Sequence, residues 1–347
     1  KLHAGVAPNA LHVAKGRVKR TGVHEGTREG FLGSLGAWIE TPVEGSRLYW
    51  VYGGAGAGKS AVAQTLCEKY RHTHLAAAYF YSRNDSTRNT IDSFVPTIAY
   101  QLAKSPHLES HLAPAIDSKV WSDPGILNCD WEEQFQQLIY KPCTQVQPHL
   151  WLSLPRLVII DGLDECMDHN SGGEVRAGPD LGVQEGQIQL LSMLHHFTSA
   201  QPPLPLHFLI LSRPEDAITK FFRSHTFTPP IQHFDMHNLH AGSHNDIELY
   251  VRYHLALIQN SHMKGIIAPD WPGEMAIRQL VVMADGQFLY IVTAVRYISS
   301  YNPEHPLPQD RLAVVLCARE APLYPLLSNI DQLFHQILQP FAFTPTQ

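Results

Sequence analysis

The sequence carries little charge and has no excess of basic residues. Charged side chains occupy 17% of its 347 positions, against roughly 25% in an average soluble protein. Hydrophobic residues make up 44% of the chain, so a packed core can form, and a disordered tail or an acidic spacer is excluded. The 26 basic and 32 acidic residues give a formal net charge of -6, which argues against a general binder of nucleic-acid phosphates.

Paired cysteines and long apolar runs are also missing. The five cysteines form no CxxC pair, so neither a disulfide framework nor a zinc knuckle is indicated, and a reducing, cytoplasmic location fits best. The longest apolar runs, such as 288–295, fall short of the 18 residues that a membrane-spanning helix needs. The 21 histidines show no recognised ligand spacing with cysteines or carboxylates. We therefore expect no membrane contact and no structural metal.

Length and periodicity predict an α/β domain followed by a helical one. At about 150 residues per domain, the chain is long enough for two. Apolar runs predict five buried strands, at 48–52, 74–81, 156–160, 206–211 and 231–234. Helical spacing is found before the first strand, at 31–39, and between the strands, at 59–70, 91–102, 187–197 and 215–222. Strands that alternate with helices indicate a parallel five-stranded sheet with crossover helices.

Strand patterns disappear after about residue 240. Helical spacing at 247–257, 274–284, 288–299 and 323–338 predicts a small all-helical domain. The segments 168–186 and 301–308 are predicted to be a loop insertion and an interhelical linker. Residues 1–25 lack sustained periodicity and are predicted to be an extended lead-in. Because Lys1 opens the chain and no signal segment follows it, we expect a piece of a longer protein.

A glycine-rich turn lies between the first predicted strand and the helix after it. Residues 53–60 (GGAGAGKS) match GxxxxGK[ST], the P-loop. Glycines let successive N–H groups point at phosphate oxygens, and the new helix directs its positive end at the same charge. A lysine here reaches the β- and γ-phosphates, and the next hydroxyl is a ligand for Mg²⁺. The predicted nucleotide-binding residues of this segment are Gly53, Gly54, Ala55, Gly56, Ala57, Gly58, Lys59, Ser60 and Ala61.

An acidic cluster follows the third predicted strand. Asp161 ends an apolar run in the form of a Walker B strand, which holds the magnesium shell together with Ser60. Hydrolysis also needs a carboxylate that orients or deprotonates the attacking water, and Asp164 and Glu165 are the candidates. For either of these two, a solvated acidic loop is the alternative interpretation.

Arg213 follows the fourth predicted strand, at the sheet edge where ligands bind in open parallel sheets. A guanidinium there could contact the γ-phosphate and report whether the nucleotide is intact. The alternative is an arginine that pairs with an acidic helix start, Glu215 or Asp216. We favour the sensing role because the strand end faces the phosphates.

Seven segments in order resemble the NACHT NTPases of the STAND class, most closely the NLR-like NACHT proteins of fungi and their nephrocystin-type N-terminal NTPase region. The segments are 26–28 (GTR), 53–60 (the P-loop), 80–83 (FYSR), 94–102 (FVPTIAYQL), 161–166 (DGLDEC), 211–215 (LSRPE) and 284–290 (ADGQFLY). The resemblance implies a molecular switch that is closed with ADP and that opens and self-associates when ATP replaces it. It also implies that Thr27 and Arg28 lie near the adenine.

The resemblance assigns a role to each part of the chain. It implies a lead-in at 1–25, a NACHT P-loop NTPase domain at 26–240, a helical domain at 241–322 and the start of a truncated winged-helix unit at 323–347. Gly162 stands where fast AAA+ ATPases carry the catalytic glutamate, so we expect slow turnover of ATP to ADP and phosphate.

Two other functions stay open. The first is a non-hydrolysing scaffold in which a bound nucleotide stabilises a protein-interaction platform. The second is a P-loop kinase, which is less favoured because no lid or acceptor-binding motif is evident. No NKxD-type guanine motif is seen, but this does not settle ATP against GTP.

Overall fold

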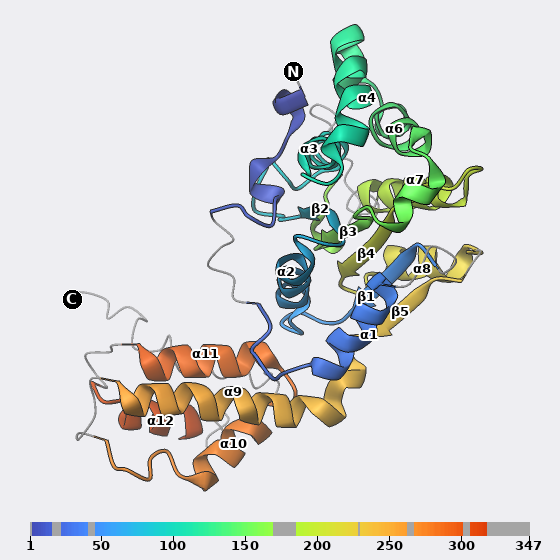
Figure 1. The fold of residues 1–347 in the computed structure, drawn as a ribbon. Coiled ribbons are helices and arrows are strands. Elements are labelled where there is room, and N and C mark those ends of the chain that lie inside the picture. Colours follow the sequence, from blue (N-terminus) through green and yellow to red (C-terminus); the bar gives the residue numbers. More distant parts are fainter. Residues whose placement is uncertain are drawn as a thin grey trace, which may run out of the picture. The chain divides into compact units, whose positions relative to one another are not determined.

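The computed structural model describes residues 2–15, 22–40, 46–168, 185–227, 230–261, 267–300 and 306–317 (Figure 1). By its internal contacts the chain forms two compact units. We call the first the sheet unit; it comprises Lys1–Val23, Gly30–Gly54 and Lys59–Met236. The second, the helical unit, comprises His24–Glu29, Ala55–Gly58 and His237–Gln347. Two short segments from the first sixty residues therefore group with the helices of the C-terminal third.

The sheet unit is built on five parallel strands. They are β1 (Leu48–Tyr52), β2 (Leu75–Phe80), β3 (Leu157–Asp161), β4 (His207–Ser212) and β5 (Gln232–Asp235). Their order in the sheet is β2-β3-β4-β1-β5. Every pair is parallel, so the carboxyl ends of all strands meet at one edge. The predicted α/β fold with a five-stranded parallel sheet is confirmed.

Helices cover the sheet; the first precedes β1 in sequence and the others lie between the strands. They are α1 (Glu29–Glu40), α2 (Lys59–Tyr70), α3 (Phe94–Lys104), α4 (Glu109–Ser122), α5 (Trp131–Phe135), α6 (Lys141–Gln145), α7 (Glu185–Ser199) and α8 (Asp216–Ser224). Short helical turns connect them: η3 (Pro124–Asn128), η4 (Gln136–Tyr140), η5 (Pro148–Leu152) and η6 (Leu163–Glu165). Helix α2 packs against β3 and β4, and α3 packs against β2.

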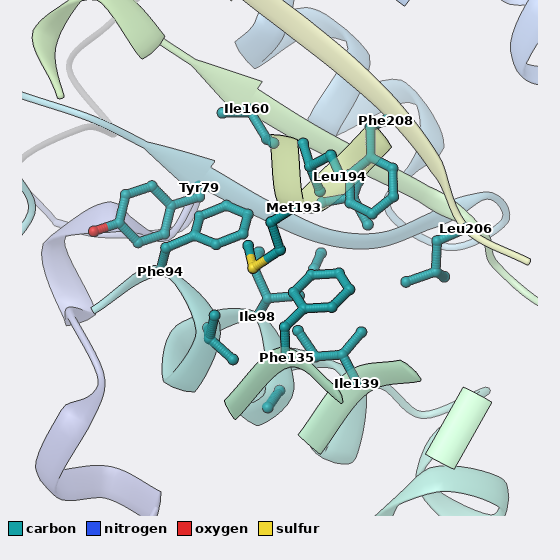
Figure 2. Packing of buried hydrophobic residues seen from close by; sticks show 14 of the residues in the cluster. Tyr79, Phe94, Ile98, Phe135, Ile139, Ile160, Met193, Leu194, Leu206 and Phe208 are labelled. Atoms are coloured by element: carbon teal, nitrogen blue, oxygen red, sulfur yellow. The ribbon is translucent and has the colours of Figure 1, made fainter. Parts of the chain in front are cut away.

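Strands β2, β3 and β4 are fully buried, as near-continuous apolar runs in a parallel sheet require. Alternate residues point to one face, where they meet the side chains of α3, α5, η4 and α7 (Figure 2). Figure 2 labels the members of this core, which include Tyr79, Phe94, Ile98, Phe135, Ile139, Ile160, Met193, Leu194, Leu206 and Phe208. This packing fixes the sheet, and with it the position of every strand end.

The lead-in has a partner within the sheet unit. Its two short turns, η1 (Leu2–Gly5) and η2 (Pro8–Ala10), lie against α3 and β2 respectively. Leu2 and Ala10 are buried, and the Ala7 N–H donates to the Thr97 hydroxyl over 2.9 Å. Residues 2–10 of the lead-in are therefore packed onto the sheet unit.

The helical unit consists mainly of α9 (His240–Asn260), α10 (Glu274–Ala284), α11 (Phe288–Ser299) and α12 (Pro308–Cys317), and a short turn, η7 (Met236–Leu239), precedes them. The predicted helices at 247–257, 274–284 and 288–299 are confirmed, although α9 is longer than expected. Helix α12 was not predicted. Its Arg311 is only 2% exposed and donates from Nε to the Ile298 carbonyl over 2.8 Å, so a charged residue occupies a buried position and interrupts the apolar pattern.

Some expectations fall outside the described residues. These are the winged-helix start at 323–347, most of the loop insertion at 168–186 and most of the linker at 301–308. Within the described ranges, no helix combines the length and the apolar character that a membrane crossing demands.

Candidate nucleotide-binding site

Lys59 begins α2 directly after the glycine-rich turn. Its ammonium group donates to the carbonyls of Gly53 and Gly54 over 2.7 and 2.9 Å. Burial lowers the pKa of Lys59, whereas the negative charges of Asp164, Asp161 and Glu165 raise it. The lysine and the three carboxylates of the acidic segment are thus close enough to interact electrically within the sheet unit.

Ser60 and Ala61 occupy the first turn of α2 and are half-buried. The N–H groups of a first helical turn have no partner inside the helix. They therefore remain available to an anion, and the helix dipole favours negative charge at the same place. This part of the P-loop has the local structure that the sequence predicts.

The tip of the P-loop, Ala55–Gly58, belongs to the helical unit. Gly56 and Gly58 have φ angles of 75° and 85°, in the left-handed region that favours glycine. Space is restricted as well, because a Cβ on Gly56 would lie 2.6 Å from the Leu289 Cβ. A Cβ on Gly58 would lie 2.6 Å from Nη1 of Arg28. Conformation and close approach both require glycine at these two positions.

Thr27 and Arg28 also lie in the helical unit. The Thr27 hydroxyl donates to the His24 carbonyl over 2.7 Å, and the Arg28 guanidinium donates to the Ala57 carbonyl over 2.6 Å and to the Gly58 carbonyl over 3.4 Å. Burial lowers the pKa of Arg28 to about 10, and the charge of Asp246 opposes that shift. Arg28 is thus joined to the P-loop itself.

The acidic segment is held at the carboxyl edge of the sheet by backbone hydrogen bonds. The Asp161 carbonyl accepts from the Tyr81 N–H, and the Gly162 N–H donates to the Leu211 carbonyl, both over 2.9 Å. Asp161 is only 2% exposed. Gly162 adopts φ 75°, so a glutamate at this position would pay the cost of the left-handed region. The turn conformation itself therefore disfavours a carboxylate there.

Asp164 and Arg213 form an ion pair across the edge. Oδ1 of Asp164 accepts from the Arg213 N–H over 2.9 Å, and Oδ2 lies 3.3 Å from Nε of the guanidinium. The Asp164 side chain is 6% exposed and that of Arg213 is 50% exposed. The acidic partner that the structure records for Arg213 is therefore Asp164 and neither residue at the start of α8.

Two residues that the sequence analysis gave no role hold this acidic segment. Nη2 of Arg83 donates to the Asp164 carbonyl over 3.1 Å, and the Arg83 N–H donates to Oε2 of Glu165 over 3.0 Å. Nε2 of the buried Gln187 donates to the carbonyls of Asp164 and Cys166. The position of Arg83 just after β2 could have indicated its contact with the acidic segment, because parallel strands end at one edge of the sheet. Gln187 lies on α7, and nothing in its local sequence indicates its contact.

A family model described as "Nephrocystin 3, N-terminal" matches residues 26–213. The match covers more than half of the 347 residues. The chain belongs to the nephrocystin 3 N-terminal family. The match begins two residues before Arg28 and ends at Arg213, so it contains the glycine-rich turn and the acidic segment. The nephrocystin-type part of the expected resemblance is confirmed. The search of curated proteins found no match to the chain.

Proposed function

We propose that this member of the nephrocystin 3 N-terminal family is an ATP-binding, slowly hydrolysing signalling switch of the NACHT/STAND type. One observation carries the proposal. The P-loop joins β1 to α2, while Asp161, Asp164 and Arg213 follow β3 and β4 of the same parallel sheet. Ligands of open parallel sheets bind outside the carboxyl ends of the strands. A P-loop, a strand-end carboxylate and a strand-end arginine are what binding of a nucleoside triphosphate requires there.

Mg²⁺ fits the donor set of the sheet unit. Ser60 offers a hydroxyl and Asp161 a carboxylate, and Mg²⁺ prefers oxygen ligands and commonly takes one or two from the protein. The ion would supply charge neutralisation to the β- and γ-phosphates. Lys59 would add a positive charge beside them, and Arg213 would contact the γ-phosphate with its exposed part.

Slow hydrolysis is supported by the contacts that the carboxylates of Asp164 and Glu165 already make. Both oxygens of Asp164 face Arg213, so this side chain serves chiefly to hold the arginine. Glu165 accepts the Arg83 N–H with Oε2, which leaves it as the better candidate to orient water. Because Gly162 provides no side chain and Asp164 is engaged by Arg213, Glu165 is the carboxylate of the acidic segment that we propose as the general base.

The switch function rests on the resemblance to fungal NACHT proteins and on the grouping of the P-loop tip with the helical unit. We infer that exchange of ADP for ATP alters this unit and permits self-association through the NTPase module. A cytoplasmic location of the whole protein agrees with that role, and so does the lack of a CxxC pair in the sequence.

Isothermal titration calorimetry with Mg-ATP tests nucleotide binding. Lys59→Ala removes the ammonium group at the start of α2, and we expect it to abolish measurable heat of ATP binding. Lys69→Ala is the matched control, because Lys69 is an exposed lysine at the other end of the same helix, and it should bind as the parent does. An unchanged ATP affinity in Lys59→Ala would overturn the assignment.

A non-hydrolysing scaffold is the second candidate function, and the engagement of Asp164 by Arg213 favours it. A single-turnover assay of phosphate release separates the two. Phosphate release by the parent that is lost in Glu165→Gln supports the switch. Binding of ATP without any release by the parent supports the scaffold.

A further inference from the structure

We propose that Arg28 is a positioning residue of the P-loop, which aims the loop's N–H groups by holding the two carbonyls behind them. The proposal rests on the proposed nucleotide binding and refines it. The sequence resemblance places Arg28 near the adenine. Its guanidinium, however, donates to the Ala57 carbonyl over 2.6 Å and lies 3.4 Å from the Gly58 carbonyl, which points to the phosphates instead.

The geometry of the peptide bond connects these contacts to the loop's N–H groups. In a planar trans peptide, the carbonyl and the next residue's N–H point in opposite directions. A carbonyl of Ala57 that is fixed on Arg28 therefore turns the Gly58 N–H to the other side. The Gly58 carbonyl does the same for the N–H of Lys59. These two N–H groups belong to the set that cradles phosphates in a P-loop.

Two contacts within the helical unit and an unusual backbone conformation fix Arg28 itself. Its N–H donates to Oδ2 of Asp246 on α9 over 3.0 Å. Its guanidinium lies 4.8 Å from the ring centroid of Phe288 on α11, a cation–π contact. Its φ of 56° is unusual for a residue with a side chain. A residue held in such a conformation by its surroundings presents its fork in one orientation, as a positioning role demands.

The closeness of Gly58 to Arg28 supports the same role. The Nη1 and Nη2 atoms would lie 2.6 and 3.0 Å from a Cβ at position 58. No side chain can therefore separate the guanidinium from the loop backbone. The planar fork can reach two neighbouring carbonyls, whereas an ammonium group at the end of a lysine provides a single point charge.

The test compares ADP with adenosine by calorimetry for the parent, Arg28→Ala, Arg28→Lys and Arg252→Ala. Arg252 is the matched control, because it lies in the same helical unit and bonds to Glu248 and Glu274. We expect Arg28→Ala to weaken ADP binding by about tenfold to a hundredfold, as for the loss of hydrogen bonds from a charged donor. Adenosine binding should not change, Arg28→Lys should restore part of the loss, and Arg252→Ala should behave as the parent.

Each result has a distinct meaning. A parent chain that fails to bind ADP contradicts the proposed function itself. A parent that binds ADP, with Arg28→Ala binding equally well, contradicts the positioning role alone. Equal losses for ADP and adenosine also overturn it, because they indicate contact with the nucleoside. If Arg28→Ala does not fold, as judged by its thermal unfolding without nucleotide, the ratio of ADP to adenosine affinity in Arg28→Lys decides between these outcomes.

Discussion

Ionisable side chains lie at both edges of the sheet, but the signs of their charges differ between the two edges. At the carboxyl edge, Asp161 and Asp164 lie near Lys59 and Arg213, so charges of both signs are present. At the amino edge, Arg47 and Arg156 precede β1 and β3, and His207 begins β4. No carboxylate is among the causes that shift the pKa values of these three groups.

At the amino edge, burial disfavours the charged forms of all three groups and so shifts their pKa values. Burial lowers the pKa values of Arg47 and Arg156. Burial together with the charges of Arg156 and Arg47 lowers the pKa of His207 to about 3. Shifted pKa values often mark functional sites. Here the amino edge, which lies away from the P-loop, also carries shifted pKa values, so opposite charges at the ends of neighbouring strands identify the site better than a shifted pKa does.

The largest effect that we expect concerns acid stability at the amino edge. The pKa of His207 in the folded chain is below the ordinary 6.5. Between these two pKa values, His207 binds a proton in the unfolded chain and stays neutral in the folded chain. Stability is therefore complete above pH 6.5 and falls by up to about 1.4 kcal/mol per pH unit as the pH drops toward 3. Urea unfolding at pH 6.5 and 4.5 should show the parent losing roughly 2 kcal/mol more than His207→Gln.

A control for this prediction is His233→Gln, which removes a histidine from an exposed position on β5. It should keep the acid sensitivity of the parent. The account of the amino edge would be contradicted by a pH dependence in His207→Gln that equals that of the parent.

A smaller effect is expected at the carboxyl edge from Asp164→Asn. The amide can still accept the Arg213 N–H, but the ion pair is lost. Because Arg213 is half exposed, solvent screens the pair, and the loss should be about 1 kcal/mol of unfolding free energy at pH 7. Asp164→Ala also leaves the Arg213 N–H without its partner and should cost about 2 kcal/mol.

Glu215→Gln is the control for the Asp164 variants, since Glu215 is the carboxylate at the start of α8 that could have paired with Arg213. Its urea unfolding should match that of the parent. A loss in Glu215→Gln as large as that in Asp164→Asn would mean that the acidic helix start, and not Asp164, holds the arginine.

Local sequence patterns were sufficient for the sheet and for locating the glycine-rich turn and the acidic segment at its strand ends. Buried strands of a parallel sheet are apolar throughout, so β3 and β4 could be found from composition, and the P-loop has a fixed spacing. The Asp164–Arg213 ion pair joins residues 49 positions apart, and the sequence analysis named only Glu215 or Asp216 as a partner, as the alternative to the sensing role. Long-range pairing of this kind leaves no local pattern.

Other features were missed for the same reason. The hydrogen bonds of Arg28 to loop carbonyls 29 and 30 residues further along the chain were not predicted, and its place near the adenine stays a prediction. The lead-in lacks periodicity because Leu2 and Ala10 are buried by two short turns, of which η1 packs on α3 and η2 on β2. Helix α12 was not predicted because the buried Arg311 interrupts its apolar spacing; Nε of this arginine donates to a backbone carbonyl of α11.

Hydrogen–deuterium exchange with and without Mg-ATP tests the central claim, that the P-loop edge binds the nucleotide, most directly. The account predicts slower exchange in peptides that cover 53–61 and 161–165, and no change at the amino edge around 46–48 and 155–157. Lys59→Ala should remove the protection. Exchange that is unchanged at 53–61, or slowed only elsewhere in the chain, would contradict it.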